Sequence, residues 1–269
     1  MAKETKVRTW YYQQFDANQN LEIPGEGYGG WKTAVLPFDL QRTGFVFMHA
    51  WDCGMPEQDP AGRRVCEYLA RADKIVRDVF PGLLGALRSA GLKIYHIAGF
   101  EEGLGSYAGY KKAGERKDVP PANTAVPCDN YKALQKFREQ NVFPGGHNLA
   151  ELEKRVPKNF TPQAKPVENE GIALNGAQLA AMCAADGVNH LIYSGFAINW
   201  CLLMSPGGML DMSKRGFMCS TIRQAVTAVE NKESARAEAH KEEALWRVAL
   251  NFGFVFDAED IIAAVRKIK

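Results

Sequence analysis

Apolar residues recur along this chain in blocks with two different periods. Short continuous apolar runs, typical of strands covered on both faces, occupy residues 44–49, 92–98, 190–195, 217–222 and 252–256. Segments with helical periodicity lie between and around them, at 63–79, 81–90, 131–139, 149–154, 174–186, 201–214, 234–250 and 258–267. This alternation predicts a three-layer α/β/α fold around a mostly parallel sheet, in which ligands bind at the carboxyl ends of the strands.

The pattern divides the chain into an arm and one large domain. Residues 1–35 carry many aromatic side chains without a regular period and then a glycine-rich stretch, which predicts an irregular arm packed on the body or on a partner subunit. Residues 36–269 form the domain. Within it, residues 99–165 hold many Gly and Pro and little strand pattern. A connection of this length is usually functional, so we expect a lid or a site loop there.

Composition narrows the functional classes. The formal net charge is +2 and the basic residues form no long stripe, which argues against a nucleic-acid partner. No run approaches the ~20 apolar residues of a membrane span, and the N-terminus has no apolar signal core, so we expect a cytoplasmic protein. The six cysteines show neither a CxxC pair nor a metal-type spacing. Most are therefore expected to be small buried hydrophobes.

Two strand ends carry residues capable of chemistry. His49 ends the first long apolar run, and Cys201 follows the run at 190–195 across a sharp turn into a helix. A helix N-terminus favours a thiolate and presents free N–H groups to an oxyanion. Because carboxyl ends of parallel strands share one edge of a sheet, we expect His49 and Cys201 to lie close together.

The turn around Cys201 resembles that of the isochorismatase-like cysteine hydrolases. Their hallmark Gly-Val-Ala-Thr-Asn-Val-Cys is matched here at Gly195, Ala197, Asn199 and Cys201, and the similarity extends over about residues 40–267. The resemblance implies a six-stranded parallel sheet and a homo-oligomer, dimer or tetramer. It also implies a Cys-Asp-Lys set that hydrolyses C–N bonds of small amides, ureides or carbamoyl compounds, as in nicotinamidase and N-carbamoylsarcosine amidase. A non-proline cis peptide bond, here Ala197–Ile198, would shape an oxyanion hole with Cys201.

Two positions depart from the family's catalytic set. His49 takes the place of the aspartate, and Glu168, eight residues before Gly176, takes the place of the lysine. The replacements still form a plausible triad, in which Cys201 is the nucleophile, the His49 imidazole the base, and the Glu168 carboxylate orients the imidazole. Within a short alignment slip the third member is instead one of three other residues, Lys165, Glu170 and Asp52.

The remaining site residues are expected to form a pocket without a metal or cofactor. Residues 98–102 stand where nicotinamidases carry a metal-binding cluster, and they contain no histidine, which predicts that no metal takes part. We expect the pocket for a small-molecule substrate to be lined by Trp51, Phe100, Tyr107, Asn199 and Trp200.

Three functions are consistent with this set of residues. The first is hydrolysis of a small C–N compound through a thioester-type intermediate on Cys201. The second is a small-molecule-binding pseudoenzyme, because two of the three family residues are replaced. The third is isochorismate-type vinyl-ether hydrolysis, which needs an acidic residue where His49 stands and is therefore disfavoured.

Overall fold

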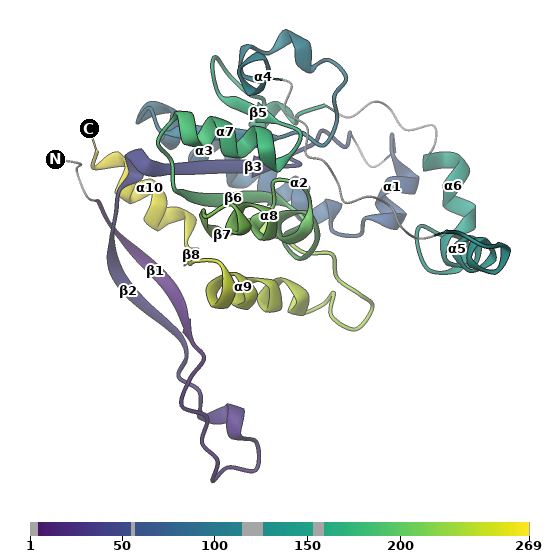
Figure 1. The fold of residues 1–269 in the computed structure, drawn as a ribbon, viewed down its shortest axis with the longest axis horizontal. Helices are drawn as coiled ribbons and strands as arrows, with labels where there is room; N and C mark the ends of the chain where they lie inside the picture. Colours follow the sequence, from purple (N-terminus) through teal and green to yellow (C-terminus); the bar gives the residue numbers. More distant parts are fainter. Residues whose placement is uncertain (1–4, 55–56, 115–125, 153–158, 269) are drawn as a thin grey trace.

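The computed structural model describes residues 5–54, 57–114, 126–152 and 159–268. They form one eight-stranded sheet in the order β2-β1-β8-β7-β6-β3-β4-β5, flanked by helices on both faces (Figure 1). The strands are β1 Thr5–Gln13, β2 Gly30–Phe38, β3 Thr43–Met48, β4 Lys93–Ile97, β5 Gly171–Ala173, β6 His190–Phe196, β7 Met218–Thr227 and β8 Val255–Phe256.

The three-layer α/β fold is confirmed, but the sheet differs from the six parallel strands expected. Strands β3 to β8 all pair in parallel, which accounts for six. The sheet is larger and mixed because β1 pairs antiparallel with β8 at the bridge Trp10↔Val255 and brings β2 with it.

The prediction of an irregular arm over residues 1–35 was wrong. β1 and β2 form a continuous antiparallel ribbon whose register runs from Thr5↔Phe38 to Gln13↔Gly30. The aromatic and β-branched residues of this segment fit a pleated ribbon. Trp31 packs edge-to-face on Trp10 and Tyr12, with ring centroids 6.5 and 5.3 Å apart, so the aromatic residues stabilise the ribbon.

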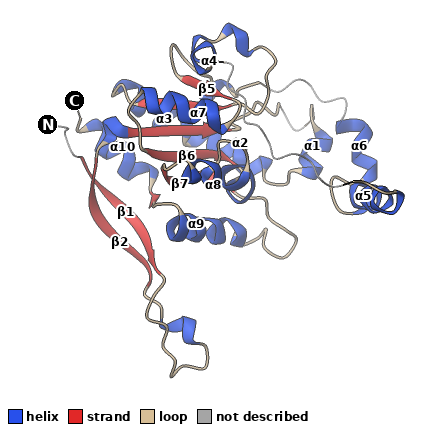
Figure 2. Ribbon diagram, viewed as in Figure 1, coloured by secondary structure: helices blue, strands red, loops and turns tan. Residues whose placement is uncertain are grey.

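Helices cover both faces of the parallel part of the sheet (Figure 2). One apolar core lies under α7 Gly176–Ala185, α8 Met209–Lys214 and α9 Ala239–Asn251. The other lies under α2 Leu69–Asp78, α3 Phe80–Ser89 and α10 Ala258–Arg266. The further α-helices are α1 Pro60–Val65, α4 Ala108–Ala113, α5 Asp129–Asn141 and α6 Gly146–Leu152. Among the described residues, no helix has the length and apolar character that a membrane crossing requires.

Two local elements differ from the expected pattern. The helix predicted over 201–214 is interrupted, with a π-helical turn η5 Ile198–Leu202 followed by α8 from Met209. Pro206, which lacks a donor N–H, and Gly207, which has φ +78°, lie between η5 and α8 and interrupt the helix there. The strand β5 was not predicted because its three residues are too few to show a period.

A buried histidine makes the fold sensitive to acid. His190, at the start of β6, lies 2.8 Å through Nε2 from the Ser220 hydroxyl, and burial lowers the pKa of His190 to about 4. The unfolded chain, with a histidine pKa of about 6.5, therefore takes up this proton first as the pH falls. We expect up to about 3 kcal/mol of unfolding free energy to be lost between about pH 6.5 and pH 4.

Urea denaturation at pH 7 and pH 4.5 tests this expectation. His190→Gln cannot titrate, so its unfolding free energy should fall less between the two pH values than that of the unchanged protein. An equal fall in both proteins would show that another group causes the acid sensitivity.

Candidate active site

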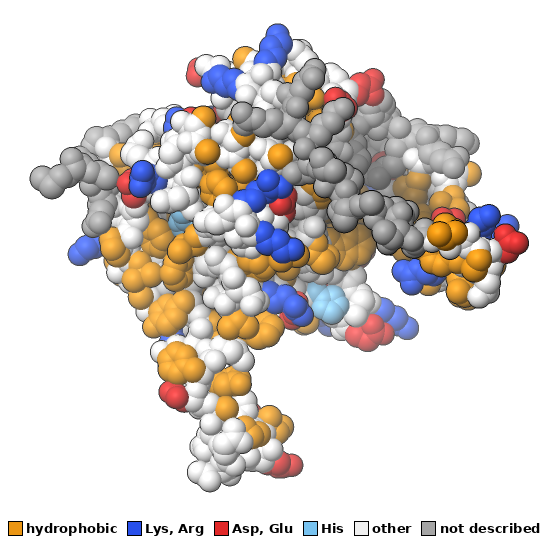
Figure 3. Space-filling model, viewed as in Figure 1, with side chains coloured by type: hydrophobic (Ala, Val, Ile, Leu, Met, Phe, Trp, Pro, Cys, Tyr) orange, Lys and Arg blue, Asp and Glu red, His pale blue; other side chains and the backbone are white. Residues whose placement is uncertain are grey.

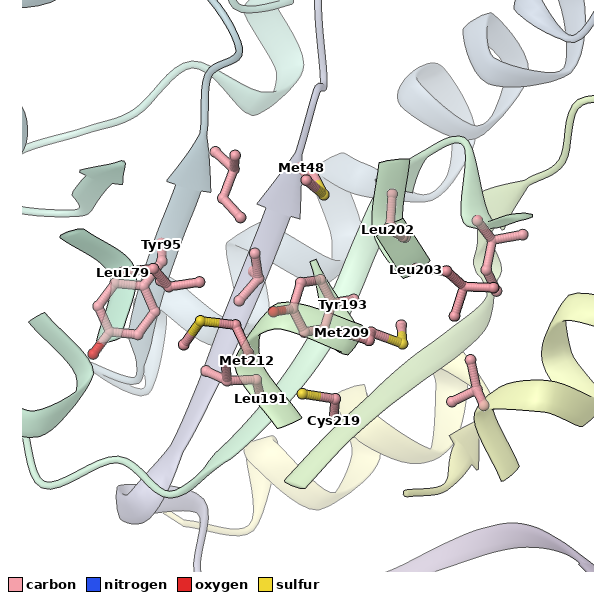
Figure 4. Close-up of a cluster of buried hydrophobic side chains, with 14 of the residues drawn as sticks. Met48, Tyr95, Leu179, Leu191, Tyr193, Leu202, Leu203, Met209, Met212 and Cys219 are labelled. Atoms are coloured by element: carbon pink, nitrogen blue, oxygen red, sulfur yellow. The ribbon is translucent and has the colours of Figure 1, made fainter. Parts of the chain in front are cut away.

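The carboxyl ends of β3 and β6 meet at one edge of the sheet. The two strands pair in parallel, and their last register pair is Met48↔Gly195. His49 follows the first strand, and the turn that leads to Cys201 follows the second. Figure 4 shows Met48 at the end of β3 beside Leu202 of η5. The expected placement of these two strands as neighbours is confirmed.

The turn into η5 is held by one backbone carbonyl. Ala197 O accepts hydrogen bonds from Trp200 N at 3.2 Å and from Leu202 N at 3.1 Å. The non-proline cis peptide bond is Phe196–Ala197, one residue earlier than the Ala197–Ile198 bond expected. Ala197 and Ile198 are both buried, and the turn places Cys201 in η5, five residues after the end of β6.

Asn199 is used to fix this turn. Its Nδ2 donates to Val229 O at 2.8 Å, and its Oδ1 accepts from Val229 N at 2.9 Å. Both polar ends of the side chain are thus engaged with the segment that follows β7. Asn199 therefore anchors the turn that carries Cys201, and its place in the substrate pocket stays a prediction.

The cysteines differ in their capacity to act as nucleophiles. Cys183 and Cys219 are fully buried, and burial raises the pKa of each thiol to about 12. A thiol with such a pKa is almost wholly protonated at neutral pH and is inert. Cys201 is only partly buried and packs at the border of the core under α8 and α9. Of these three, Cys201 is the thiol that solvent can reach.

His49 is held in an unusual conformation by its neighbours. Its backbone has φ +53°, and its ring stacks on Trp51 with centroids 4.6 Å apart at an interplanar angle of 23°. The Trp51 indole N–H donates to the Ala98 carbonyl oxygen. Both rings lie over Gly99, the second residue after β4. The imidazole thus leans toward the β4 side of the edge, whereas Met48 belongs to the core that Cys201 borders.

Gly99 is required at its position by the two rings above it. A Cβ there would lie 2.7 Å from His49 Nε2 and 3.0 Å from Trp51 Cζ2, and its φ is +65°. Gly103→Ala is a matched control, because Gly103 has φ +78° and open space at the Cβ position. Because alanine is strained at a positive φ, we expect both variants to lose ~1 kcal/mol or more of unfolding free energy. Gly99→Ala should lose a further ~1–3 kcal/mol, because its Cβ would clash with the two rings. Equal unfolding free energies by urea denaturation would contradict the placement of the rings.

The structure does not bring Glu168 to this edge, so its assignment to the triad needs correction. Glu168 is exposed and lies three residues before β5 begins at Gly171. β5 reaches the edge only at its last residue, since Ala173 pairs with Ile97. The strand starts later than the alignment assumed, which leaves Glu168 at the amino-terminal side of the sheet.

The three alternatives to Glu168 differ in position and in contacts. Glu170 is bound to His96 of β4 and to Arg88 of α3, and Lys165 is exposed. Asp52 follows His49 by three residues, is exposed, and accepts a hydrogen bond from Gly54 N at 2.9 Å. Of the three, Asp52 is the carboxylate that lies in the segment after β3.

Three of the aromatic residues expected to wall one pocket are linked through Phe160. Trp51 stacks on His49 and pairs with Phe160 in an isolated antiparallel bridge, and Phe100 and Tyr107 pack on Phe160 at centroid distances of 5.1 and 5.7 Å. Trp200 is exposed and meets Phe143 edge-to-face at 5.6 Å. Phe143 and Phe160 were not predicted as partners of these rings, because neither stands in a sequence pattern that marks it.

Two further expectations concern the N-terminal ribbon and a metal site. The base of the ribbon lies at the amino end of β6, where Phe38 stacks on His190, and the tip projects below α9 (Figure 1). Within residues 5–54, 57–114, 126–152 and 159–268, no group of three or more His, Cys, Asp or Glu side chains is arranged to hold a metal ion.

Comparisons with known proteins place the fold. No family model matches the chain, and no curated protein matches it. A cysteine hydrolase from Pseudomonas syringae pv. phaseolicola 1448A superimposes with a TM-score of 0.50 at 14% identity, over 87% of this chain and 97% of that one. This chain shares the fold of that cysteine hydrolase. The three-layer α/β fold that the resemblance implied is therefore confirmed.

Other solved structures are more distant. An isochorismatase family protein from Burkholderia thailandensis has a TM-score of 0.42 at 13% identity, covering 84% of this chain and 96% of that one. The N-carbamoylsarcosine amidase from Thermoplasma acidophilum has a TM-score of 0.40 at 10% identity, covering 81% and 97%. At such identities the likeness concerns the fold, and the chemistry has to be argued from the residues of this chain.

Proposed function

We propose that this protein is a cysteine-dependent hydrolase that cleaves a C–N bond of a small amide, ureide or carbamoyl compound. The observation that carries the proposal is a partly exposed thiol, Cys201, in a turn fixed at both ends by hydrogen bonds at the carboxyl edge of the sheet. This edge is where parallel α/β sheets bind their ligands. The fold shared with a cysteine hydrolase is consistent with the proposal.

The proposed chemistry proceeds in two steps. The Cys201 sulfur, after passing its proton to His49, attacks the carbonyl carbon, and the C–N bond breaks as the nitrogen leaves with that proton. Water then attacks the thioester and returns the thiol. For a direct transfer the His49 and Cys201 side chains must come within hydrogen-bond reach or share one bridging water.

A second candidate is a small-molecule-binding protein without turnover. Two observations favour it: the His49 ring is held on the β4 side by Trp51, and Glu168 lies on the amino-terminal side of the sheet. In that case Cys201 would be an ordinary thiol on the wall of a binding site.

A panel of small amides, ureides and carbamoyl compounds, assayed by ammonia release, tests the proposal. We expect at least one substrate class to be turned over by the unchanged protein and by Cys128→Ala, which replaces an exposed thiol on the α5 segment. Cys201→Ala should show no release. Turnover that survives in Cys201→Ala would overturn the proposed mechanism, and no turnover of any compound would favour the binding protein.

A further inference from the structure

The end of the β1–β2 ribbon is an exposed apolar knob. We call residues 14–29 the hairpin tip. Three of its apolar side chains are strongly exposed, Phe15 at 57%, Leu21 at 40% and Ile23 at 59% of their surface. Apolar side chains gathered at the end of a projecting ribbon expose much of their surface, and such surfaces mark sites of interaction.

The hairpin tip is nevertheless folded by its own hydrogen bonds. Asn18 N donates to Pro24 O at 3.0 Å, Leu21 N to Asn18 O at 3.1 Å, and Glu26 N to Ile23 O at 3.0 Å. At its base, Gln14 accepts a hydrogen bond from the Trp246 indole at 3.0 Å. A preformed shape lowers the ordering cost of binding, which suits the hairpin tip to docking.

A second exposed apolar surface lies on α5 and the residues that follow it. We define the α5 surface as the five exposed apolar side chains of Tyr131, Leu134, Phe137, Val142 and Phe143. The first three follow at spacings of three and so share one side of the helix. No residue of α5 is buried. A helix with an apolar side normally packs that side against a partner, and the described residues of this chain leave the side exposed.

The two surfaces stand on different sides of the molecule. The hairpin tip projects below α9, whereas α5 and α6 project beyond the carboxyl edge of the sheet (Figure 1). Figure 3 shows apolar side chains on both projections. A hairpin tip therefore reaches an α5 surface only on another copy of the chain.

The hairpin tip and the α5 surface carry side chains of opposite charge. The hairpin tip carries Asp16, Glu22 and Glu26 and has no basic residue. Two of these acids adjoin the exposed apolar residues in sequence. The α5 surface includes a cation in its midst, because Arg138 follows Leu134 by four residues and so lies on the same side of the helix. An acidic apolar knob and an apolar surface with a guanidinium are complementary.

We propose that the hairpin tip of one copy docks on the α5 surface of a second copy of this chain. Each copy carries both surfaces, so two identical contacts close a symmetric dimer. Phe143 of the α5 surface contacts Trp200, the residue before Cys201, so the docked tip would lie beside the candidate site of its partner. This inference stands on exposed surfaces and charge, and it does not depend on the proposed hydrolase activity.

Charge reversal in two separate chains tests the pairing. The tip variant carries Asp16→Lys and Glu22→Lys, and the helix variant carries Arg138→Glu. The unchanged protein should have at least twice the 29.8 kDa mass of the chain by light scattering. Each variant alone should assemble with a dissociation constant at least ~100-fold higher, because like charges meet in both of its contacts. An equimolar mixture should assemble again, because both contacts in a mixed dimer then join opposite charges.

The design separates the proposal from its alternatives. Reassembly of the mixture shows that both variants are folded, and Lys267→Glu at the end of α10 serves as a control that should keep the full mass. The proposal is overturned if the unchanged protein is a monomer, if either variant alone assembles as tightly as the unchanged protein, or if the mixture does not reassemble.

Discussion

Replacing Cys201 with alanine is expected to lower kcat/KM by ~10⁴-fold or more on any substrate that the protein hydrolyses. A thiol that forms the covalent intermediate has no substitute in the site, and removing a nucleophile usually eliminates most of the rate enhancement. The loss should occur without unfolding, because Cys201 is only partly buried and alanine leaves the turn bonds of Ala197 and Asn199 in place. Steady-state kinetics together with urea denaturation measure both effects.

Two further variants show whether His49 and Glu168 act as the sequence suggested. His49→Ala should lower kcat/KM nearly as much as Cys201→Ala, since residues that act as a unit are not additive. Glu168→Gln should leave kcat/KM unchanged, because the exposed Glu168 side chain stands on the amino-terminal side of the sheet. A loss in Glu168→Gln comparable to that in His49→Ala would contradict the placement of β5.

The largest effect on stability is expected at Glu170. Its carboxylate is nearly buried and accepts from His96 Nε2 at 2.9 Å, from Arg88 Nε at 2.7 Å and from Arg88 Nη2 at 3.0 Å. Glu170→Ala leaves the wholly buried His96 imidazole and the Arg88 guanidinium without this partner. We expect a loss of about 3 kcal/mol or more in the free energy of unfolding, which chemical denaturation at pH 7 measures.

The same carboxylate predicts the pH range of its contribution. Burial alone would raise the pKa of Glu170, but the hydrogen bonds from His96 and Arg88 lower it to about 2, against an ordinary value of 4.5. The contribution is therefore complete above about pH 4.5 and is lost as the pH falls toward 2. Glu168→Ala, two residues away and exposed, should change stability by less than ~0.5 kcal/mol. A similar loss in both variants would show that the buried contacts of Glu170 contribute little.

Much of the sheet could be predicted because its strands are buried on both faces. The runs at 44–49, 92–98 and 190–195 became β3, β4 and β6, each within one or two residues. These strands are continuous apolar segments whose length and flanking turns distinguish them from helices. Their shared edge followed from parallel topology, which is why β3 and β6 could be placed as neighbours from the sequence.

The remaining features depend on contacts that no local period reveals. The arm became a ribbon because β1 finds a partner in β2 across a 16-residue connection and then adds to β8. Glu168 was misplaced because β5 has only three residues, and in so short a strand a shift of a few positions moves a side chain from one edge of the sheet to the other. The stacking of His49 on Trp51 over Gly99 depends on two left-handed backbone positions that the sequence does not mark.

We propose that Cys201 is an activated nucleophile. The direct test is alkylation by iodoacetamide at neutral pH, with the rate at each cysteine measured by mass spectrometry. Cys128 is an exposed thiol of the same chain and gives the internal reference for an ordinary rate. We expect Cys201, although less exposed, to be labelled first and stoichiometrically, and His49→Ala to slow this labelling but leave Cys128 unaffected. Labelling of Cys201 at or below the rate of Cys128, unchanged by His49→Ala, would show that Cys201 is an ordinary thiol and would favour a protein that binds without catalysis.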